Sequence, residues 1–158
     1  STVRRHEEII SHIAPLETEL QYAVQGDISD CNLYRTEEGK LGVFDFNRCG
    51  DNNLFFDTVM QAVFEARLMD YPEELGEQRE EIIFSSFLEG YQQIRPFTER
   101  QKEAFPYLYA MITAFWGVDM KWTDSTCMKT VDESDDDTVR QWMKDILKRE
   151  TDMRTIPG

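Results

Sequence analysis

The sequence predicts an α+β fold that is mainly α-helical, with one small β-hairpin in its first third. After residue 54, apolar residues recur at helical spacing in several segments. Before that point, two short β-compatible segments flank a turn that contains a glycine. The 158 residues suffice for one core, so we expect a single domain over 1–158.

The N-terminal part predicts one helix and three strands. Residues 3–14 place three isoleucines on one side of a helix, and a proline then interrupts it. These isoleucines are Ile9, Ile10 and Ile13. Residues 20–24 are apolar and β-compatible. Residues 32–34 and 41–44 are expected to form the hairpin, because the glycine between them adopts a left-handed turn conformation without strain.

Two long helices are expected next, over residues 54–69 and 77–94. The residues predicted to point into the core are Phe56, Val59, Val63 and Ala66 of the first helix, and Ile82, Ile83, Phe84, Phe87, Leu88 and Tyr91 of the second. Pro96 stops the second helix. Thr98 and Gln101 have the spacing of a capping box, which predicts the start of a third helix.

The C-terminal part predicts further helical structure. Residues 105–122 are rich in aromatic side chains and are expected to be buried. The acidic segment DESDDD (132–137) introduces a last amphipathic helix, capped by Ser134 or a neighbouring Asp. The apolar face of this helix is formed by Val139, Trp142, Met143, Ile146 and Leu147.

The charge balance restricts the partners. The chain has 31 Asp and Glu against 17 Lys and Arg, a formal net charge of −14. Because nucleic acids and anionic membranes attract Lys and Arg, this balance argues against both as partners. It favours a small cationic ligand, or it serves solubility alone. No apolar run is long enough to span a bilayer, and no signal peptide is visible.

The cysteines and histidines do not predict a metal site. Cys31, Cys49 and Cys127 are widely spaced and form no C-x-x-C pair, so neither a zinc site nor a disulfide framework is supported. A reducing cytoplasm is the expected location. His6 and His12 have no ligand-spaced Cys or paired acid nearby, and we expect both at the surface.

The stretch QGDISDCNLYRTEEGKLGVFDF, residues 25–46, combines three polar residues with a hairpin. Asp27 and Asn32 have the spacing D-x-x-x-x-N, and Asp45 follows the hairpin in a D-F pair. Phosphoryl transfer needs a carboxylate that orients and deprotonates the acceptor hydroxyl, and oxygen ligands for magnesium. Kinases supply these groups from a D-x-x-x-x-N loop and from a D-F element beyond a hairpin. The stretch therefore predicts phosphoryl-transfer chemistry.

These motifs resemble those of the aminoglycoside phosphotransferase-like family of small-molecule kinases, which includes choline, homoserine and antibiotic kinases. The resemblance is sharpest at 25–57, where GDNNLFFD (50–57) also matches, and it extends to FLEGYQQIRPFTERQ (87–101). It implies a protein-kinase-like C-terminal lobe. In such a lobe a leading helix and strand (1–24) precede the catalytic and metal-binding loops, and residues 58–158 form a helical substrate-binding part.

By that resemblance, Asp27 is the catalytic base, and Asn32 and Asp45 bind magnesium and, through it, the co-substrate ATP. The acceptor is implied to be a hydroxyl of a small molecule of aminoglycoside, choline or amino-alcohol type. The net charge is in keeping with a cationic acceptor.

Three residues are expected to support the site: Gln25, Gly26 and Asp57. The resemblance implies that Asp57 braces the catalytic loop through backbone amides at a helix start, and a carboxylate near a helix start also meets unpaired N–H groups. Gln25 departs from the family, which usually has His before Gly-Asp, and Asn47 replaces an acidic residue or Gly.

The chain is expected to lack the N-terminal ATP lobe. No G-x-G-x-x-G loop, strand Lys or partner Glu precedes residue 25. We therefore expect this chain alone to transfer phosphate poorly or not at all.

Two other interpretations remain open. Asp27 and Asp30 also suit turn capping, in which case the motif is accidental and the chain is a helical interaction domain. Alternatively, the chain is a catalytically inactive kinase-like binding module, as Gln25 and the missing lobe would allow. No Ser or Cys has a His base nearby, so a nucleophilic triad is not supported.

Overall fold

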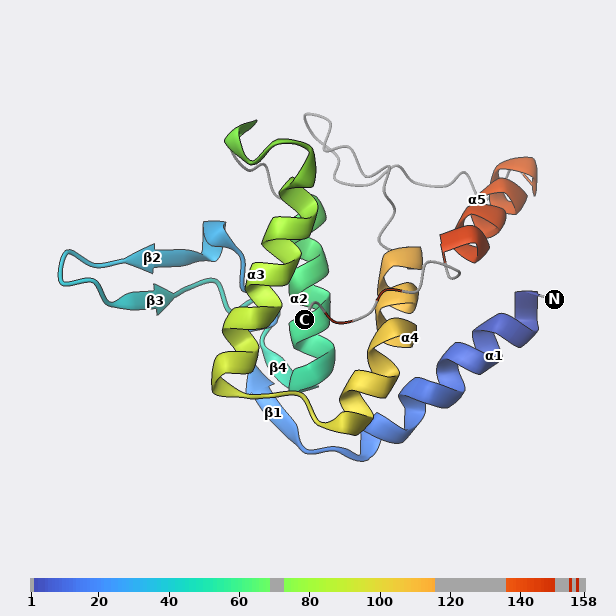
Figure 1. Cartoon of the computed structure of the whole chain (residues 1–158), viewed down its shortest axis with the longest axis horizontal. Helices are drawn as coiled ribbons and strands as arrows, with labels where there is room; N and C mark the ends of the chain where they lie inside the picture. Colours follow the sequence, from blue (N-terminus) through green and yellow to red (C-terminus); the bar gives the residue numbers. More distant parts are fainter. Residues whose placement is uncertain (1, 69–72, 116–135, 150–153, 155, 157–158) are drawn as a thin grey trace. The chain divides into compact units, whose positions relative to one another are not determined.

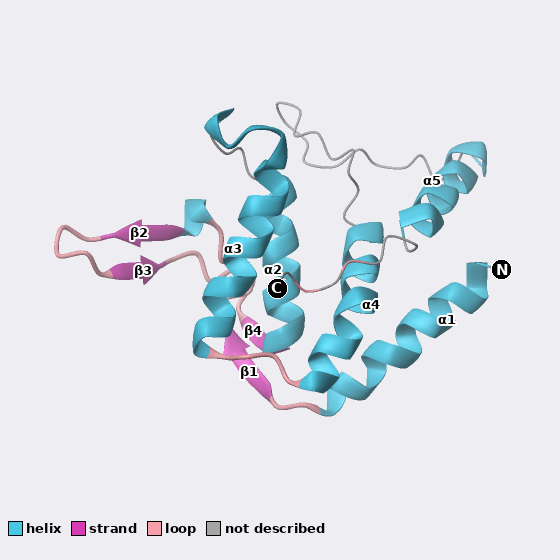
Figure 2. Ribbon diagram, in the orientation of Figure 1, coloured by secondary structure: helices cyan, strands magenta, loops and turns pink. Residues whose placement is uncertain are grey.

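The computed structural model describes residues 2–68, 73–115, 136–149, 154 and 156. The chain is α+β and mostly helical, as predicted, and it has two small antiparallel sheets where the sequence predicted one hairpin (Figure 1, Figure 2). It divides into two compact units, residues 1–15 with 98–158, and residues 16–97. The expectation of a single domain over 1–158 stays a prediction.

The first unit contains three helices: α1 (Thr2–Ile13), α4 (Glu99–Phe115) and α5 (Asp136–Arg149). α1 and α5 each contact α4. The expected helix at 3–14 is confirmed, and Ile9 and Ile13 are buried. The placement of Ile10 on the buried side is wrong, because Ile10 lies about 100° around the helix from Ile9 and is 43% exposed.

The predicted capping box opens α4. The backbone amide of Thr98 donates to Oε1 of Gln101 at 3.0 Å, and the amide of Gln101 donates to Oγ1 of Thr98 at 3.2 Å. The box satisfies amides that a helix start leaves unpaired. Phe105 and Tyr109 are buried, as predicted for this aromatic-rich segment, whereas residues 116–122 lie outside the described residues.

Ile146 of α5 is buried and Leu147 is half-buried, in line with the predicted apolar face. The other predicted members of that face (Val139, Trp142 and Met143) and the predicted cap Ser134 lie outside the described side chains.

Both histidines of α1 are exposed, as predicted. His12 is nevertheless engaged, because its ring stacks on Tyr107 of α4 with 3.7 Å between centroids.

The short 3-10 helix η1 (Ala14–Thr18) contains the boundary between the units, and the second unit begins at its residue Leu16. Strand β1 (Gln21–Val24) follows, as expected for 20–24, and pairs antiparallel with β4 (Gly50–Asn53). Gln21 lies opposite Asn53 and Val24 opposite Gly50. The sequence did not predict β4, because GDNN lacks the β-branched and aromatic residues that favour strands.

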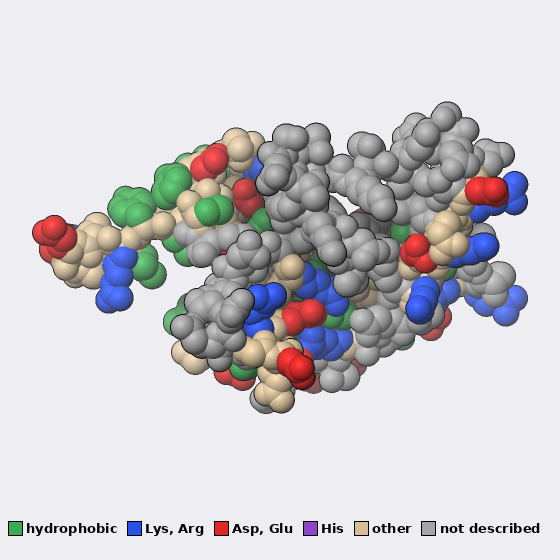
Figure 3. Space-filling model, turned by 90° about the horizontal axis from the view of Figure 1, so that it is seen from above, with side chains coloured by type: hydrophobic (Ala, Val, Ile, Leu, Met, Phe, Trp, Pro, Cys, Tyr) green, Lys and Arg blue, Asp and Glu red, His purple; other side chains and the backbone are tan. Residues whose placement is uncertain are grey.

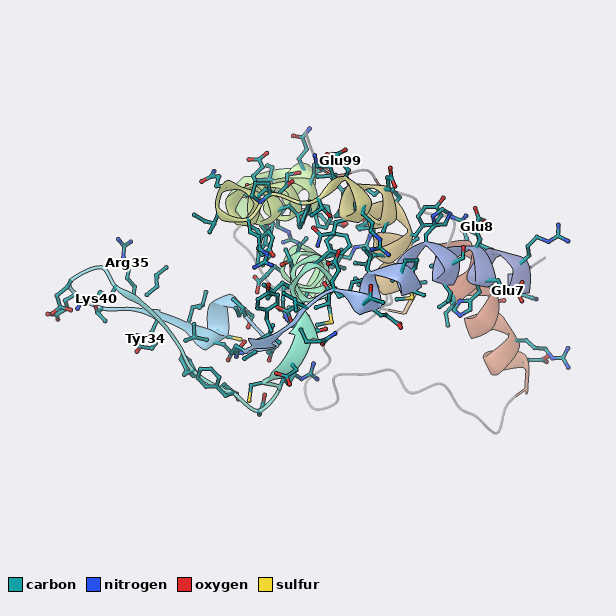
Figure 4. The ribbon with its side chains drawn as sticks, turned by 90° about the horizontal axis from the view of Figure 1, so that it is seen from below. Glu7, Glu8, Tyr34, Arg35, Lys40 and Glu99 are labelled. Atoms are coloured by element: carbon teal, nitrogen blue, oxygen red, sulfur yellow. The ribbon has the colours of Figure 1, made fainter. Side chains whose placement is uncertain are left out.

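The predicted hairpin is formed by β2 (Leu33–Arg35) and β3 (Leu41–Val43). It projects from the helices of its unit (Figure 1). Tyr34 lies over Gly42, where a Cβ atom would overlap the tyrosine ring. Apolar side chains line the hairpin and charged ones lie toward its tip, among them Arg35 and Lys40 (Figure 3, Figure 4).

Two helices form the core of this unit: α2 (Leu54–Leu68) and α3 (Arg79–Ile94), which pack together. A 3-10 segment, η3 (Glu73–Gln78), precedes α3. Of the residues predicted to point inward, five are buried (Val59, Val63, Ala66, Phe84 and Leu88) and four are half-buried (Phe56, Ile83, Phe87 and Tyr91).

The inward placement of Ile82 is wrong, because this residue lies about 200° around the helix from Phe84 and is 41% exposed. In α2, Phe55 rather than Phe56 is the fully buried aromatic residue. Among the described residues, no helix is long and apolar enough to cross a membrane.

Candidate functional site

The candidate site consists of the loop after β1, residues 25–32, and the segment after β3, residues 44–48. The loop ends in a short 3-10 turn, η2 (Asp30–Asn32), in which the amide of Asn32 donates to the carbonyl of Ser29 at 3.0 Å. This turn leads directly into β2, so the hairpin begins at Leu33, the residue after the loop. The loop and the segment that follows the hairpin therefore lie at the same end of it.

Gln25 connects the two parts of the site through both ends of its side-chain amide. Its Nε2 donates to the carbonyl of Asp45 at 2.6 Å and to that of Phe44 at 3.1 Å. Its Oε1 accepts from the backbone amide of Asp27 at 2.8 Å. The side chain is 8% exposed, so these bonds are largely shielded from water. We call this set of three bonds the Gln25 clamp.

Gly26 is required by backbone geometry. Its φ is +82°, in the left-handed region that side chains other than glycine rarely adopt. A Cβ atom at this position would also overlap the backbone carbonyl oxygen of Arg48. The absence of a side chain therefore lets loop 25–32 approach segment 44–48 closely.

Asp27 and Asn32, the two ends of the D-x-x-x-x-N motif, are in direct contact. Nδ2 of Asn32 donates to the backbone carbonyl of Asp27 at 2.9 Å and to its Oδ2 at 3.3 Å. Asn32 is buried and Asp27 is half-buried. The backbone carbonyl of Asn32 in turn accepts from the amide of Phe44 at 3.1 Å. Asn32 thus contacts both the predicted base and the segment that leads to the predicted metal ligand.

Asp45 adopts an unusual backbone conformation. Its φ is +56°, and no other non-glycine residue in the described part of the chain has a positive φ. Aspartate tolerates this region better than most residues, because its short polar side chain can bond to nearby backbone. Here Oδ1 of Asp45 accepts from the amide of Asn47 at 3.3 Å. The side chain is exposed, so the carboxylate is open to a ligand.

Asp57 lies in the first turn of α2 and is 7% exposed. Burial raises the pKa of its carboxyl, and a hydrogen bond with the side chain of Asn52 has a smaller, opposite effect on that pKa. No hydrogen bond joins Asp57 to the amides of loop 25–32 among the described residues, so the bracing of that loop by Asp57 stays a prediction.

The start of α2 depends on a residue that sequence reasoning missed. Oδ1 of Asn53 accepts from the amides of Phe55 at 2.9 Å and Phe56 at 3.3 Å, which makes Asn53 the N-cap. Its Nδ2 donates to the carbonyl of Leu16 at 3.0 Å and to Oε2 of Glu19 at 3.3 Å. Asn immediately before an apolar helical segment is the signal that would have identified it.

The structure therefore brings Asp27 and Asn32 together directly and joins Asp45 to them through Gln25. Among the described residues, no group of three or more His, Cys, Asp or Glu could hold a metal ion. The predicted magnesium ligands, Asn32 and Asp45, would not form such a group, because they are two residues and one of them is an Asn. Comparison with family models, curated proteins and solved structures gives no match.

Proposed function

We propose that this chain is the catalytic and substrate-binding lobe of an ATP-dependent phosphotransferase that acts on a hydroxyl of a small molecule. The observation that carries the proposal is the Gln25 clamp. It ties the Asp27 amide to the Asp45 carbonyl, which are 18 positions apart in the sequence. An accidental motif gives no reason for one buried side chain to join these two elements.

In the proposed reaction, Asp27 orients the acceptor hydroxyl and takes its proton. The side-chain amide of Asn32 holds the carboxylate of Asp27 by a hydrogen bond to its Oδ2. Oδ1 of Asp27 has no hydrogen-bond partner within the described residues, so it is available to an acceptor hydroxyl. A carboxylate held at one oxygen and open at the other suits the role of a positioned base.

The residues of the site fit magnesium by their chemistry. Because Asn32 uses its Nδ2 to bond Asp27, its Oδ1 remains for a cation, and Asp45 offers an exposed carboxylate. Carboxylate and amide oxygens are the protein ligands that magnesium prefers. Bound magnesium would offset the negative charge of the ATP phosphates during transfer. Asn32 and Asp45 are therefore the residues proposed to hold it.

The proposal includes a small cationic acceptor, such as an aminoglycoside, choline or an amino alcohol, because the chain carries a net charge of −14. The helical part after residue 54 is proposed to supply the acceptor pocket. A cytoplasmic location is proposed from Cys31 and Cys49, which are both free and exposed thiols.

Magnesium titration of the chain, followed by NMR, tests the metal part of the proposal. We expect saturable shift changes at Asn32 and Asp45, strengthened by ATP. The Asp45→Asn variant should lose them, whereas Asp51→Asn should keep them. Asp51 is the matched control, because it is an exposed aspartate on neighbouring β4. The absence of any response to magnesium, with or without ATP, would favour a kinase-like binding module.

Phosphate transfer is best measured in the longest natural protein that contains this sequence, with the Asp27→Asn variant as the comparison. If Asp27 is the base, the variant should keep ATP binding and lose at least about a hundredfold in turnover. Full activity of that variant would contradict the assignment.

A further inference from the structure

A second polar feature lies on α2 and includes none of the residues of loop 25–32 or of segment 44–48. Asp57, Gln61 and Glu65 follow one another at four-residue intervals, so their side chains share one face of the helix. They are 7, 4 and 5% exposed, respectively. The apolar core residues of α2, such as Val59 and Val63, lie on another face. Helix α2 is thus buried on a polar face as well as on an apolar one.

Two oxygen atoms on this polar face lack a donor. Oδ1 of Asp57 and Oε1 of Gln61 are buried, and within residues 2–68, 73–115 and 136–149 neither has a hydrogen-bond partner. Buried acceptors are normally paired with protein or water, because removing them from water without a donor is costly. Both acceptors therefore need N–H or O–H donors, which a bound water or the polar groups of a ligand can supply.

The chemistry of the face indicates the charge of that ligand. Asp57 and Glu65 contribute two carboxyl groups, and burial raises the pKa of Asp57, a cost that a neighbouring cation would offset. Phe64 lies three residues after Gln61, at the edge of this face, and an aromatic ring attracts an ammonium group. Phe64 and Leu54, at the border of the face, are only half-buried, so the face is approached from solvent there.

The spacing of the face indicates the shape of the ligand. Residues four apart on a helix are separated by about 6 Å along its axis. Two ammonium groups joined by a four-carbon chain span a comparable distance when extended. Each end of such a molecule donates several hydrogen bonds, which suits acceptors repeated along a helix.

We propose that the α2 polar face, formed by Asp57, Gln61, Phe64 and Glu65, is a binding site for an aliphatic diamine or polyamine. The site is independent of the proposed magnesium ligands and of phosphate transfer. The ammonium groups donate to Oδ1 of Asp57 and Oε1 of Gln61, and the two carboxyl groups balance the charge.

The test uses putrescine, a four-carbon diamine, and its diol analogue, titrated into the chain by calorimetry and by NMR. We expect saturable putrescine binding, with shift changes concentrated between Asn52 and Leu68. The diol should bind at least about tenfold more weakly, because it donates fewer bonds and carries no charge. Shift changes spread over exposed acidic residues, or no saturation, would overturn the proposal.

Variants locate the site. Gln61→Leu and Asp57→Asn should each weaken putrescine binding by at least about tenfold. Glu89→Gln, which removes one charge from an exposed position of α3, is the control and should leave binding unchanged. Equal binding by all three variants and the unaltered chain would overturn the proposal. If Gln61→Leu fails to fold, the shift map of the unaltered chain decides.

The Asp45→Asn variant separates this inference from the proposed function. It should lose the magnesium response and keep putrescine binding. Loss of putrescine binding in that variant would place the amine at the magnesium site and so contradict a separate site on α2.

Discussion

Gly26 occupies the point at which the backbone of loop 25–32 passes the carbonyl of Arg48. A methyl group there would meet both a left-handed φ and a backbone oxygen that cannot rotate away. We expect Gly26→Ala to lower the free energy of unfolding by at least about 2 kcal/mol, because the strain of the conformation adds to the overlap. Urea denaturation followed by circular dichroism measures the change.

Gly50 provides the matched control for this substitution. It belongs to the same unit, has no positive φ, and a Cβ atom built on it meets no atom within 4 Å. Gly50→Ala should change the free energy of unfolding by less than about 0.5 kcal/mol. Similar stability of the two variants would show that the close approach at Gly26 does not constrain the loop.

Asp57 gives the stability of the chain a defined dependence on pH. Because burial raises its pKa above the ordinary 3.8, the folded state holds the proton more tightly than the unfolded state does. The stability that Asp57 contributes is therefore present at low pH and is lost as pH rises from about 3.8 through the raised pKa.

Asp57→Asn cannot ionise, so its free energy of unfolding should increase relative to that of the unaltered chain as pH rises through this window. Urea denaturation at a series of pH values measures the difference. Asp51→Asn, the same change at an exposed position, should show no such slope. A difference for Asp57→Asn that is flat or falls with pH would contradict the effect of burial.

At the scale of elements, Asn53 joins three parts of the second unit. It ends β4, caps α2, and bonds to the chain near η1 through Leu16. Asn53→Ala removes the cap and leaves the Leu16 carbonyl without this donor, so the free energy of unfolding should fall by about 2–4 kcal/mol. Thermal and urea denaturation measure the loss.

Asn53→Ser separates the two contributions. Serine keeps an acceptor for the backbone amides of Phe55 and Phe56. It has no side-chain amide, however, to donate to the carbonyl of Leu16. Its stability should lie between those of the alanine variant and the unaltered chain. If serine is as damaging as alanine, the cap contributes little and the bond to Leu16 carries the effect.

The elements also show which features of the secondary structure could be predicted from local sequence. The Thr98–Gln101 capping box was predicted because both partners lie within four residues of each other and bond only to the local backbone. Strand β4 was not, because its partner β1 lies 29 positions earlier, counted from Gln21 to Gly50, and its own residues do not favour strands. Local chemistry is visible in sequence, whereas long-range pairing is not.

At the scale of the whole molecule, the mainly helical α+β class followed from hydrophobic spacing, because burial of one face requires it. The spacing was less exact within α2, where Phe55 rather than Phe56 is fully buried, since the two residues flank the direction of Val59 and Val63 on either side. The motif at 25–46 gave the order of the site residues. It did not reveal the Gln25 clamp, because the bonds of that side chain depend on the folded hairpin.

The α2 polar face could not be predicted either. Asp57, Gln61 and Glu65 have the spacing of an ordinary solvated face, and only burial in the folded chain makes them unusual.

The Gln25 clamp has a consequence for how this position can change during evolution. Glutamine and histidine codons differ by a single base, so one mutation separates the residue found here from the histidine that is usual in the kinase family proposed for this chain. The clamp nevertheless uses one amide group for three partners, and an imidazole has only two ring nitrogens. Exchange to histidine would leave the Asp27 amide or a carbonyl of residues 44–45 to find another partner. A lineage that makes the exchange is therefore expected to carry compensating changes in the segment after β3.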